Sequence, residues 1–210
     1  NSSPTQQFFF MVVLSVLMAA LGIIEGSIII IIGSMLIAPV LYPILGLSMG
    51  FVMSNSELIS RSIKTILWSI LYAIIASMFI TFLFGGGSFE ISSLPSFIKP
   101  SLLSVAVAII AGLAASFSLV KPEISETLPG VAVSVSLVPP LAAIGVGIAK
   151  FNMEIVSNAT LLFIINIMGI VFASTIIFSM MNFYIKRNVA KAEIKKDEKE
   201  AEEDTIVERK

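Results

Sequence analysis

Long apolar runs alternate with short polar connections over the first 185 residues of the chain. A transmembrane helix needs roughly 17–25 mainly apolar residues, and six runs reach about that length. None of them alternates in the way that a membrane β-strand does, and backbone amides in lipid must be paired, so each run is predicted to be a helix. The pattern predicts an all-α integral membrane protein with about six transmembrane helices. The six runs cover residues 8–24, 28–53, 66–84, 102–120, 128–149 and 155–185.

The end of the chain has a different composition. Residues 186–210 carry eight of the 13 basic and eight of the 14 acidic residues. This segment favours helix but has almost no apolar stripe, which is typical of a solvated helix or a disordered end. A tail that docks onto a partner is the alternative. The chain therefore divides into a transmembrane bundle, residues 1–185, and a charged cytoplasmic tail, residues 186–210.

The basic residues indicate the orientation, because short cytoplasmic loops of membrane proteins are enriched in Lys and Arg. With six crossings, both ends of the chain lie on one side, together with the loops that hold Arg61, Lys64 and Lys121. The opposite side holds only Lys99 and Lys150. We therefore expect a multi-pass protein of the cell membrane with cytoplasmic N- and C-termini.

The two halves of the bundle match each other at a constant shift of 97 residues. Each unit holds three hydrophobic segments, in residues 8–84 and 101–185, and an odd number of crossings inverts the second unit relative to the first. If segments two and five were re-entrant, each unit would cross twice and the repeat would be parallel; the basic residues favour six crossings. The matching pairs include Gly33/Gly130, Pro43/Pro140, Gly50/Gly147, Asn55/Asn152, Glu57/Glu154 and Ser77/Ser174.

Prolines interrupt the middle segment of each unit. Pro39 and Pro43 lie in the second segment, and Pro139 and Pro140 lie in the fifth. Proline removes an amide donor and clashes with the preceding turn, so each segment is expected to split into two half-helices. Paired interruptions at corresponding positions of two repeats indicate the binding site of a transporter. A kink packed by neighbouring helices is the structural alternative.

Polar residues near these interruptions complete the candidate pathway. Hydroxyl groups in membrane helices usually bond to their own backbone, whereas a buried Asn is more costly and more often lines a cavity or bridges helices. Glu25 could cap the half-helix that follows it, the interpretation we favour, or could titrate as an ion or proton ligand. The candidate residues for a substrate or ion pathway are Ser34, Pro39, Tyr42, Pro43, Ser134, Ser136, Pro139, Pro140, Asn166 and Glu25.

Several kinds of chemistry are excluded by composition. The chain has no His and no Cys, which removes zinc-hydrolase, Ser–His and thiolate chemistry. Its two aspartates, Asp197 and Asp204, lie in the tail, and no phosphate-binding loop motif is present. There is no basic patch for nucleic acid. We expect a protein that is not an enzyme and that needs no cofactor or metal.

The two proline-containing segments resemble a known family. GSMLIAPVLYPILGL, residues 33–47, and VSVSLVPPLAAIGVG, residues 133–147, are similar to segments of a prokaryotic membrane protein family catalogued as domain of unknown function 389. The resemblance covers about residues 10–180. It implies a multi-span helical fold and a prokaryotic source, and it implies no substrate.

Two functional hypotheses follow from these features. The first is a transporter or channel for a small solute or ion, with its pathway between the two repeats at the proline-broken helices. The second is a non-catalytic membrane subunit, a scaffold or sensor in a larger complex. Besides the lipid bilayer, we expect further copies of the chain as partners in a homo-oligomer, since small-residue faces favour helix association in membranes; a larger membrane complex is the partner in the second hypothesis.

Overall fold

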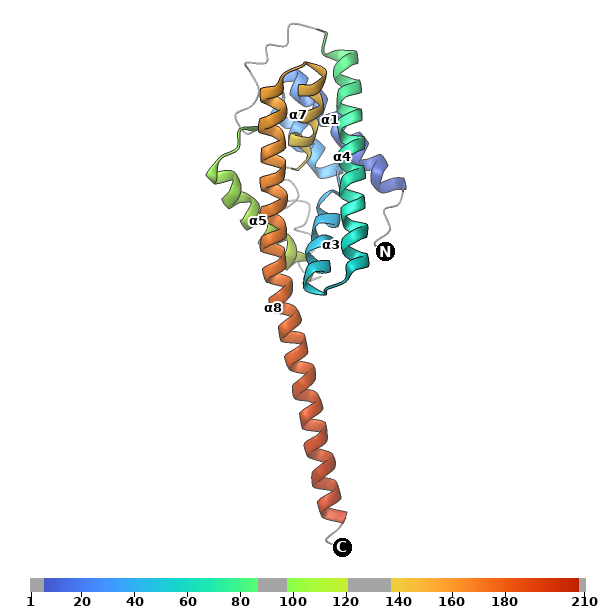
Figure 1. Cartoon of the computed structure of the whole chain (residues 1–210), viewed down its shortest axis with the longest axis vertical. Helices are drawn as coiled ribbons and strands as arrows, with labels where there is room; N and C mark the ends of the chain where they lie inside the picture. The colour runs from blue at the N-terminus through green and yellow to red at the C-terminus, as the bar shows by residue number, and fades with distance from the viewer. Residues whose placement is uncertain (1–5, 87–97, 121–136, 208–210) are drawn as a thin grey trace.

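The computed structural model describes residues 6–86, 98–120 and 137–207, with side chains described as far as residue 181. Seven α-helices form the regular structure of these ranges, and α4 and α8 run antiparallel with α3 and α7 between them (Figure 1). The C-terminal part of α8 continues beyond the bundle (Figure 1). The helices are α1 (Gln6–Glu25), α2 (Ile28–Ile37), α3 (Leu41–Val52), α4 (Ser56–Phe84), α5 (Leu102–Val120), α7 (Val138–Ala149) and α8 (Met153–Val207).

Four of these helices, α1, α4, α5 and the bundle part of α8, are long and apolar enough to cross a bilayer. They become five if α2 and α3 together form one bent span. The prediction of a multi-span helical membrane protein is therefore confirmed. The fifth expected segment contributes the apolar helix α7, while its preceding part, residues 128–136, lies outside the described residues.

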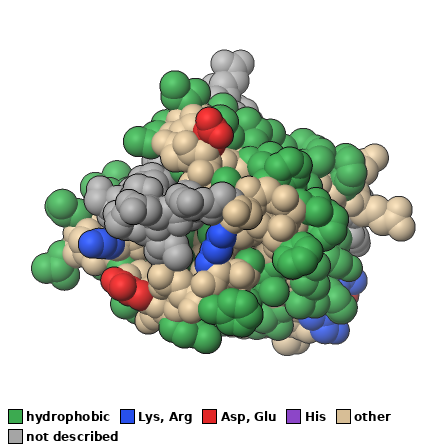
Figure 2. Space-filling view, turned by 90° about the horizontal axis from the view of Figure 1, so that it is seen from above, with side chains coloured by type: hydrophobic (Ala, Val, Ile, Leu, Met, Phe, Trp, Pro, Cys, Tyr) green, Lys and Arg blue, Asp and Glu red, His purple; other side chains and the backbone are tan. Residues whose placement is uncertain are grey.

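Apolar side chains cover the outside of the bundle. Ile29, Phe82 and Leu102 are each more than 80% exposed. Seen from one end, hydrophobic side chains form most of the rim, and charged side chains are few (Figure 2). Exposed surface of this kind is suited to acyl chains and not to water.

The turn between α3 and α4 is built around Asn55. Its side chain accepts a hydrogen bond from the Leu58 amide at 3.0 Å, and its own amide donates to the Gly50 carbonyl oxygen at 3.0 Å. The residue before it, Ser54, has φ 51°, a left-handed conformation that is uncommon outside glycine. Asn is among the residues best suited to cap a helix N-terminus, which explains why α4 begins here.

The turn between α7 and α8 has the same construction 97 residues later. The Asn152 side chain accepts from the Ile155 amide at 3.1 Å, and the Asn152 amide donates to the Gly147 carbonyl oxygen at 2.9 Å. Phe151 has φ 53°, close to that of Ser54. The two turns lie at opposite ends of the bundle (Figure 1).

Helix α7 occupies the centre of the fold. Ten of its 12 residues are buried, and it packs against α1, α4 and α8. The approach to α4 is close because Gly145 has no side chain: a Cβ at this position would lie 2.8 Å from the Ile74 carbonyl oxygen. On the other side of the bundle, α5 packs on α8 with Gly112 against Ile170 and Ala173. Small residues at helix contacts are the usual way in which membrane helices achieve dense packing.

Replacing Gly145 by Ala is expected to destabilise the bundle. The new Cβ would lie 1.7 Å from Ser77 Oγ as well as against the α4 backbone, so α4 and α7 must move apart. Overpacking of this kind typically costs about 1–3 kcal/mol. The free energy of unfolding in mixed detergent micelles measures the loss. Gly86→Ala is the matched control, because no described atom lies within 4 Å of its added Cβ; equal losses for both variants would contradict the packing argument.

Candidate functional site

The chain leaves helical geometry between α2 and α3. Helix α2 ends at Ile37, α3 begins at Leu41, and their axes differ by 52°. Ala38 is extended, with φ −81° and ψ 122°, which is the conformation favoured by a residue before proline. Pro39 follows it and lies within the connection. The bend therefore falls at a position where the sequence disfavours helix.

The other candidate prolines lie in the first turns of helices. Pro43 is the third residue of α3, and Pro139 and Pro140 are the second and third residues of α7. The first amides of a helix have no partner inside it, so proline in the first turn loses no hydrogen bond. At these positions proline also removes a donor that would otherwise be buried without a partner. Pro139 and Pro140 are less than 2% exposed. An amide N–H at either position would therefore be buried without a hydrogen-bond partner, and proline avoids that cost.

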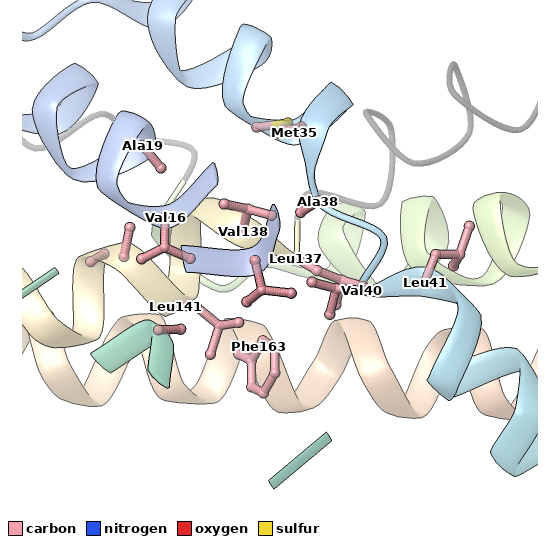
Figure 3. Packing of buried hydrophobic residues seen from close by; sticks show 14 of the residues in the cluster. Val16, Ala19, Met35, Ala38, Val40, Leu41, Leu137, Val138, Leu141 and Phe163 are labelled. Carbon is pink, nitrogen blue, oxygen red and sulfur yellow. The ribbon is translucent and has the colours of Figure 1, made fainter. Parts of the chain in front are cut away.

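The starts of α3 and α7 meet at an apolar cluster in the middle of the bundle (Figure 3). Val40 and Leu137 are the N-cap residues of the two helices, and they stand 97 positions apart in the sequence. Neither makes a side-chain cap hydrogen bond, and both are buried. We call the residues around this point the central apolar cluster: Val16, Ala38, Val40, Leu137, Val138, Leu141 and Phe163, none more than 8% exposed.

Ser34 lies on α2, four residues before Ala38 of this cluster, and is fully buried. Its hydroxyl donates to the Ile31 carbonyl oxygen at 2.6 Å, within its own helix. Ser15 on α1 donates to the Ser34 carbonyl oxygen, also at 2.6 Å. The bond from Ser15 joins α1 to α2 through the backbone carbonyl of Ser34, while the Ser34 hydroxyl is satisfied within its own helix.

The remaining candidates are scattered. Tyr42 is 54% exposed, and Glu25 is an exposed residue at the end of α1, two positions before the N-cap of α2. Asn166 is buried on α8. Ser134 and Ser136 lie outside the described residues. The structure thus brings the helix starts and Pro139 and Pro140 together, but Tyr42 and Glu25 lie at the surface.

A line of hydroxyl residues along one face of α4 is buried, a feature that was not predicted from the sequence. Its members are buried, and most of their hydroxyls donate to carbonyl oxygens one turn earlier in α4, at 2.6–3.1 Å. Such back-bonding satisfies the hydroxyl without a partner from another helix. Their spacing of three or four residues was the signal that could have identified this buried face. The residues are Ser62, Thr65, Ser69, Ser77 and Thr81.

Charged groups of the described chain lie toward the ends of the bundle helices. Arg61 pairs with Glu57 in the first turns of α4, at 2.5 Å. At the other end of α4, the Lys150 ammonium group donates to the Gly85 carbonyl oxygen and links the α7–α8 turn to the end of α4. The described residues contain no group of three or more carboxylates that could hold a metal ion.

Comparison with known proteins identifies the family of the chain and a curated relative. The family model described as "Domain of unknown function (DUF389)" matches residues 35–172, which confirms the resemblance inferred from the two proline-containing segments. "Uncharacterized protein MJ0678" of the archaeon Methanocaldococcus jannaschii is 33% identical over 179 residues, covering 83% of this chain and 54% of that protein. The chain therefore spans about half the length of this curated relative. No solved structure matches the chain.

Ser15→Ala is expected to destabilise the bundle more than Ser34→Ala. The first variant removes a hydrogen bond between two helices and leaves the Ser34 carbonyl oxygen without that donor, a loss of about 1 kcal/mol. The second removes only a bond within α2, and Ser15 still reaches the same carbonyl oxygen. Unfolding in mixed micelles compares the two variants. A larger loss for Ser34→Ala would contradict the structural role given to this pair.

Proposed function

The chain belongs to the family Domain of unknown function (DUF389), and we propose that it is a transporter or channel that moves a small solute or ion between two inverted repeats. In this proposal the protein is not an enzyme and uses no cofactor. The pathway runs between the starts of α3 and α7. The observation that carries the proposal is the meeting of these two helix starts, at Val40 and Leu137, inside the bundle.

The repeat is supported by the two hairpin turns. Helices α3 and α7 begin and end 97 residues apart, and α4 and α8 also begin 97 residues apart. Each turn has a left-handed residue, an Asn that caps the next helix, and an amide of that Asn bonded five residues back. A shared turn geometry at the shift found in the sequence is the expected result of an internal duplication.

The inversion is supported by the positions of these turns. The α3–α4 turn and the α7–α8 turn lie at opposite ends of the bundle, and α4 and α8 are antiparallel (Figure 1). Arg61 and Lys64 lie in the first turns of α4. The start of α4 is at the same end of the bundle from which α8 continues outward (Figure 1). In our proposal this end is cytoplasmic, since basic residues favour that side.

The function is supported by a recurring architecture of membrane transport proteins. Their binding sites lie near the middle of the membrane, where discontinuous helices from two inverted repeats meet. Here the meeting point is filled by the central apolar cluster. Apolar constrictions block water and ions by dewetting, so we assign this conformation to a closed state.

An asymmetry between the halves suggests how the closed state opens. Helix α1 packs against α7, whereas in the described part of the chain its counterpart α5 packs extensively on α8 alone. If the repeats exchange conformations, as in alternating access, α1 separates from α7 and α5 packs onto α3. The position equivalent to Val16 on α1 is Leu113 on α5, and the position equivalent to Leu141 is Ile44.

Val40→Ser combined with Leu137→Ser is expected to open the central apolar cluster. The change makes two buried apolar side chains smaller and polar, and their hydroxyls allow water into the constriction. Each ~1.4 kcal/mol removed from a barrier raises a rate tenfold, so we expect K⁺ or Cl⁻ efflux from KCl-loaded proteoliposomes to rise about tenfold or more.

The control for this experiment places Ser on the lipid-facing surface. Leu36→Ser combined with Leu103→Ser changes two side chains that are 58% and 77% exposed, and it should leave the efflux at the level of the unmodified chain. If the double variant at Val40 and Leu137 is folded by circular dichroism but leaks neither ion, the pathway does not run through the central apolar cluster.

Thiol cross-linking is expected to detect the exchange between conformations. The chain has no Cys, so paired substitutions are free of background. Val16→Cys with Leu141→Cys should cross-link in the closed state, because α1 and α7 pack there. Ile44→Cys with Leu113→Cys should cross-link more slowly in the otherwise unmodified chain than in the Val40→Ser, Leu137→Ser background. Cross-linking of the second pair at the same rate in both backgrounds would contradict the exchange.

The second candidate function is a non-catalytic membrane subunit. Helix α8 favours it, because the helix has 55 residues and its C-terminal part continues beyond the bundle as a charged helix that a cytoplasmic partner could bind (Figure 1). A subunit of this kind needs no water-filled route, so its central apolar cluster would serve packing only. The efflux experiment separates the two functions, since a subunit gains no ion leak from hydroxyls at residues 40 and 137.

A further inference from the structure

Two basic residues, Arg61 and Lys64, lie on the outer surface of α4, and the length of the helix sets the depth at which they enter the bilayer. Helix α4 and the membrane part of α8 each have 29 residues, about 43 Å at 1.5 Å per residue. A bilayer with its headgroups is about 40–45 Å thick, so each helix fits its full thickness. With Ser56 at the outer edge, the Arg61 backbone lies about 7 Å inside, and the Lys64 backbone lies about 12 Å inside.

At this depth, a charged side chain that stayed in the hydrocarbon would carry a large free-energy cost. The hydrocarbon core is about 30 Å thick, which leaves roughly 5–8 Å of headgroup layer on each side. Arg61 therefore lies at the boundary, and the Lys64 backbone lies within the hydrocarbon. Charged side chains at such a depth direct their heads back to the headgroup layer along their flexible stems. Both residues are exposed, so both ends can reach that layer.

The fold itself does not require these charges. At the shift of 97 residues, the equivalent positions of the second hairpin are Asn158 and Leu161, and this hairpin has the same turn. The Glu57–Arg61 ion pair is 51% exposed on the Arg side, and exposed pairs of this kind contribute little to stability. Glu57 also has an equivalent, Glu154, so only the cations are particular to the first hairpin.

Aromatic rings continue the same face of α4 toward the membrane centre. Trp68 and Tyr72 follow Lys64 by four and eight residues, so all three share one side of the helix. The two rings stack with centroids 5.7 Å apart, and Phe9 of α1 meets Tyr72 edge-on at 5.3 Å. Trp68 is 51% exposed. The surface thus has a cationic end in the headgroup layer and an aromatic end in the acyl region.

From this arrangement we infer that Arg61 and Lys64 bind the phosphate of an anionic phospholipid, whose acyl chains lie along Trp68 and Tyr72. The cations supply charge complementarity, and the aromatic face supplies contact for the chains. Basic side chains near a membrane surface each contribute about 1 kcal/mol toward anionic lipid, about a fivefold preference. Glu57 offsets part of the Arg61 charge, so we expect a preference of about fivefold for the site as a whole.

The single Trp of the chain, Trp68, reports on this site directly. The full chain is reconstituted in phosphatidylcholine vesicles that contain either brominated phosphatidylglycerol or brominated phosphatidylcholine, and quenching of its fluorescence is titrated. We expect the anionic lipid to be favoured about fivefold at Trp68. Arg61→Asn combined with Lys64→Leu introduces the residues of the second hairpin and should reduce the preference to about one.

Three controls define the outcome. Lys64→Arg keeps the charge and should retain the preference, and Lys99→Leu removes an exposed lysine outside α4 and should have no effect. Equal quenching by the two lipids, or a preference that survives the double variant, overturns the assignment. Loss of the preference on adding soluble inorganic phosphate at constant ionic strength also overturns it, since the site would then take a free anion.

Discussion

Backbone that stops being helical inside a bilayer must have its polar groups covered by protein, and this constraint organises the whole bundle. The connection between α2 and α3 and the start of α7 both meet it in the same way. Each is buried among neighbouring helices, and proline in the first turns of α3 and α7 reduces the number of donors left to cover. The central position of α7, with ten of its 12 residues buried, follows from the same need.

Covering these helix starts requires helices that approach closely, and small side chains make that possible. Gly145 lets α7 contact the α4 backbone, and the hydroxyls of Ser69 and Ser77 bond within α4 instead of reaching outward. The result is a buried, apolar centre. For a protein that conducts, such a centre is a closed gate, which is why the proposal assigns function to Val40 and Leu137 and not to the polar residues nearby.

Much of the fold could be predicted from the sequence, because long apolar runs have few solutions in lipid. The runs around residues 8–24, 66–84 and 102–120 correspond to α1, α4 and α5, and the shift of 97 residues aligns both hairpin turns. The centre of the bundle was harder to predict from the sequence. Val40 and Leu137 carry no chemical signature, and the partner of Ser34 comes from another helix. Pro43 and Pro140 indicated an interruption, but only the structure places them just after a helix start.

The central claim is that two equivalent hairpins enter the membrane from opposite sides. Ser54→Cys and Phe151→Cys place one thiol at each exposed turn tip of an otherwise thiol-free chain. Labelling with a membrane-impermeant maleimide in sealed, right-side-out vesicles tests the claim most directly. Our account predicts that Cys at 151 reacts from outside, whereas Cys at 54 reacts only after the vesicles are permeabilised. Reaction of both thiols from the same side would contradict the inverted arrangement.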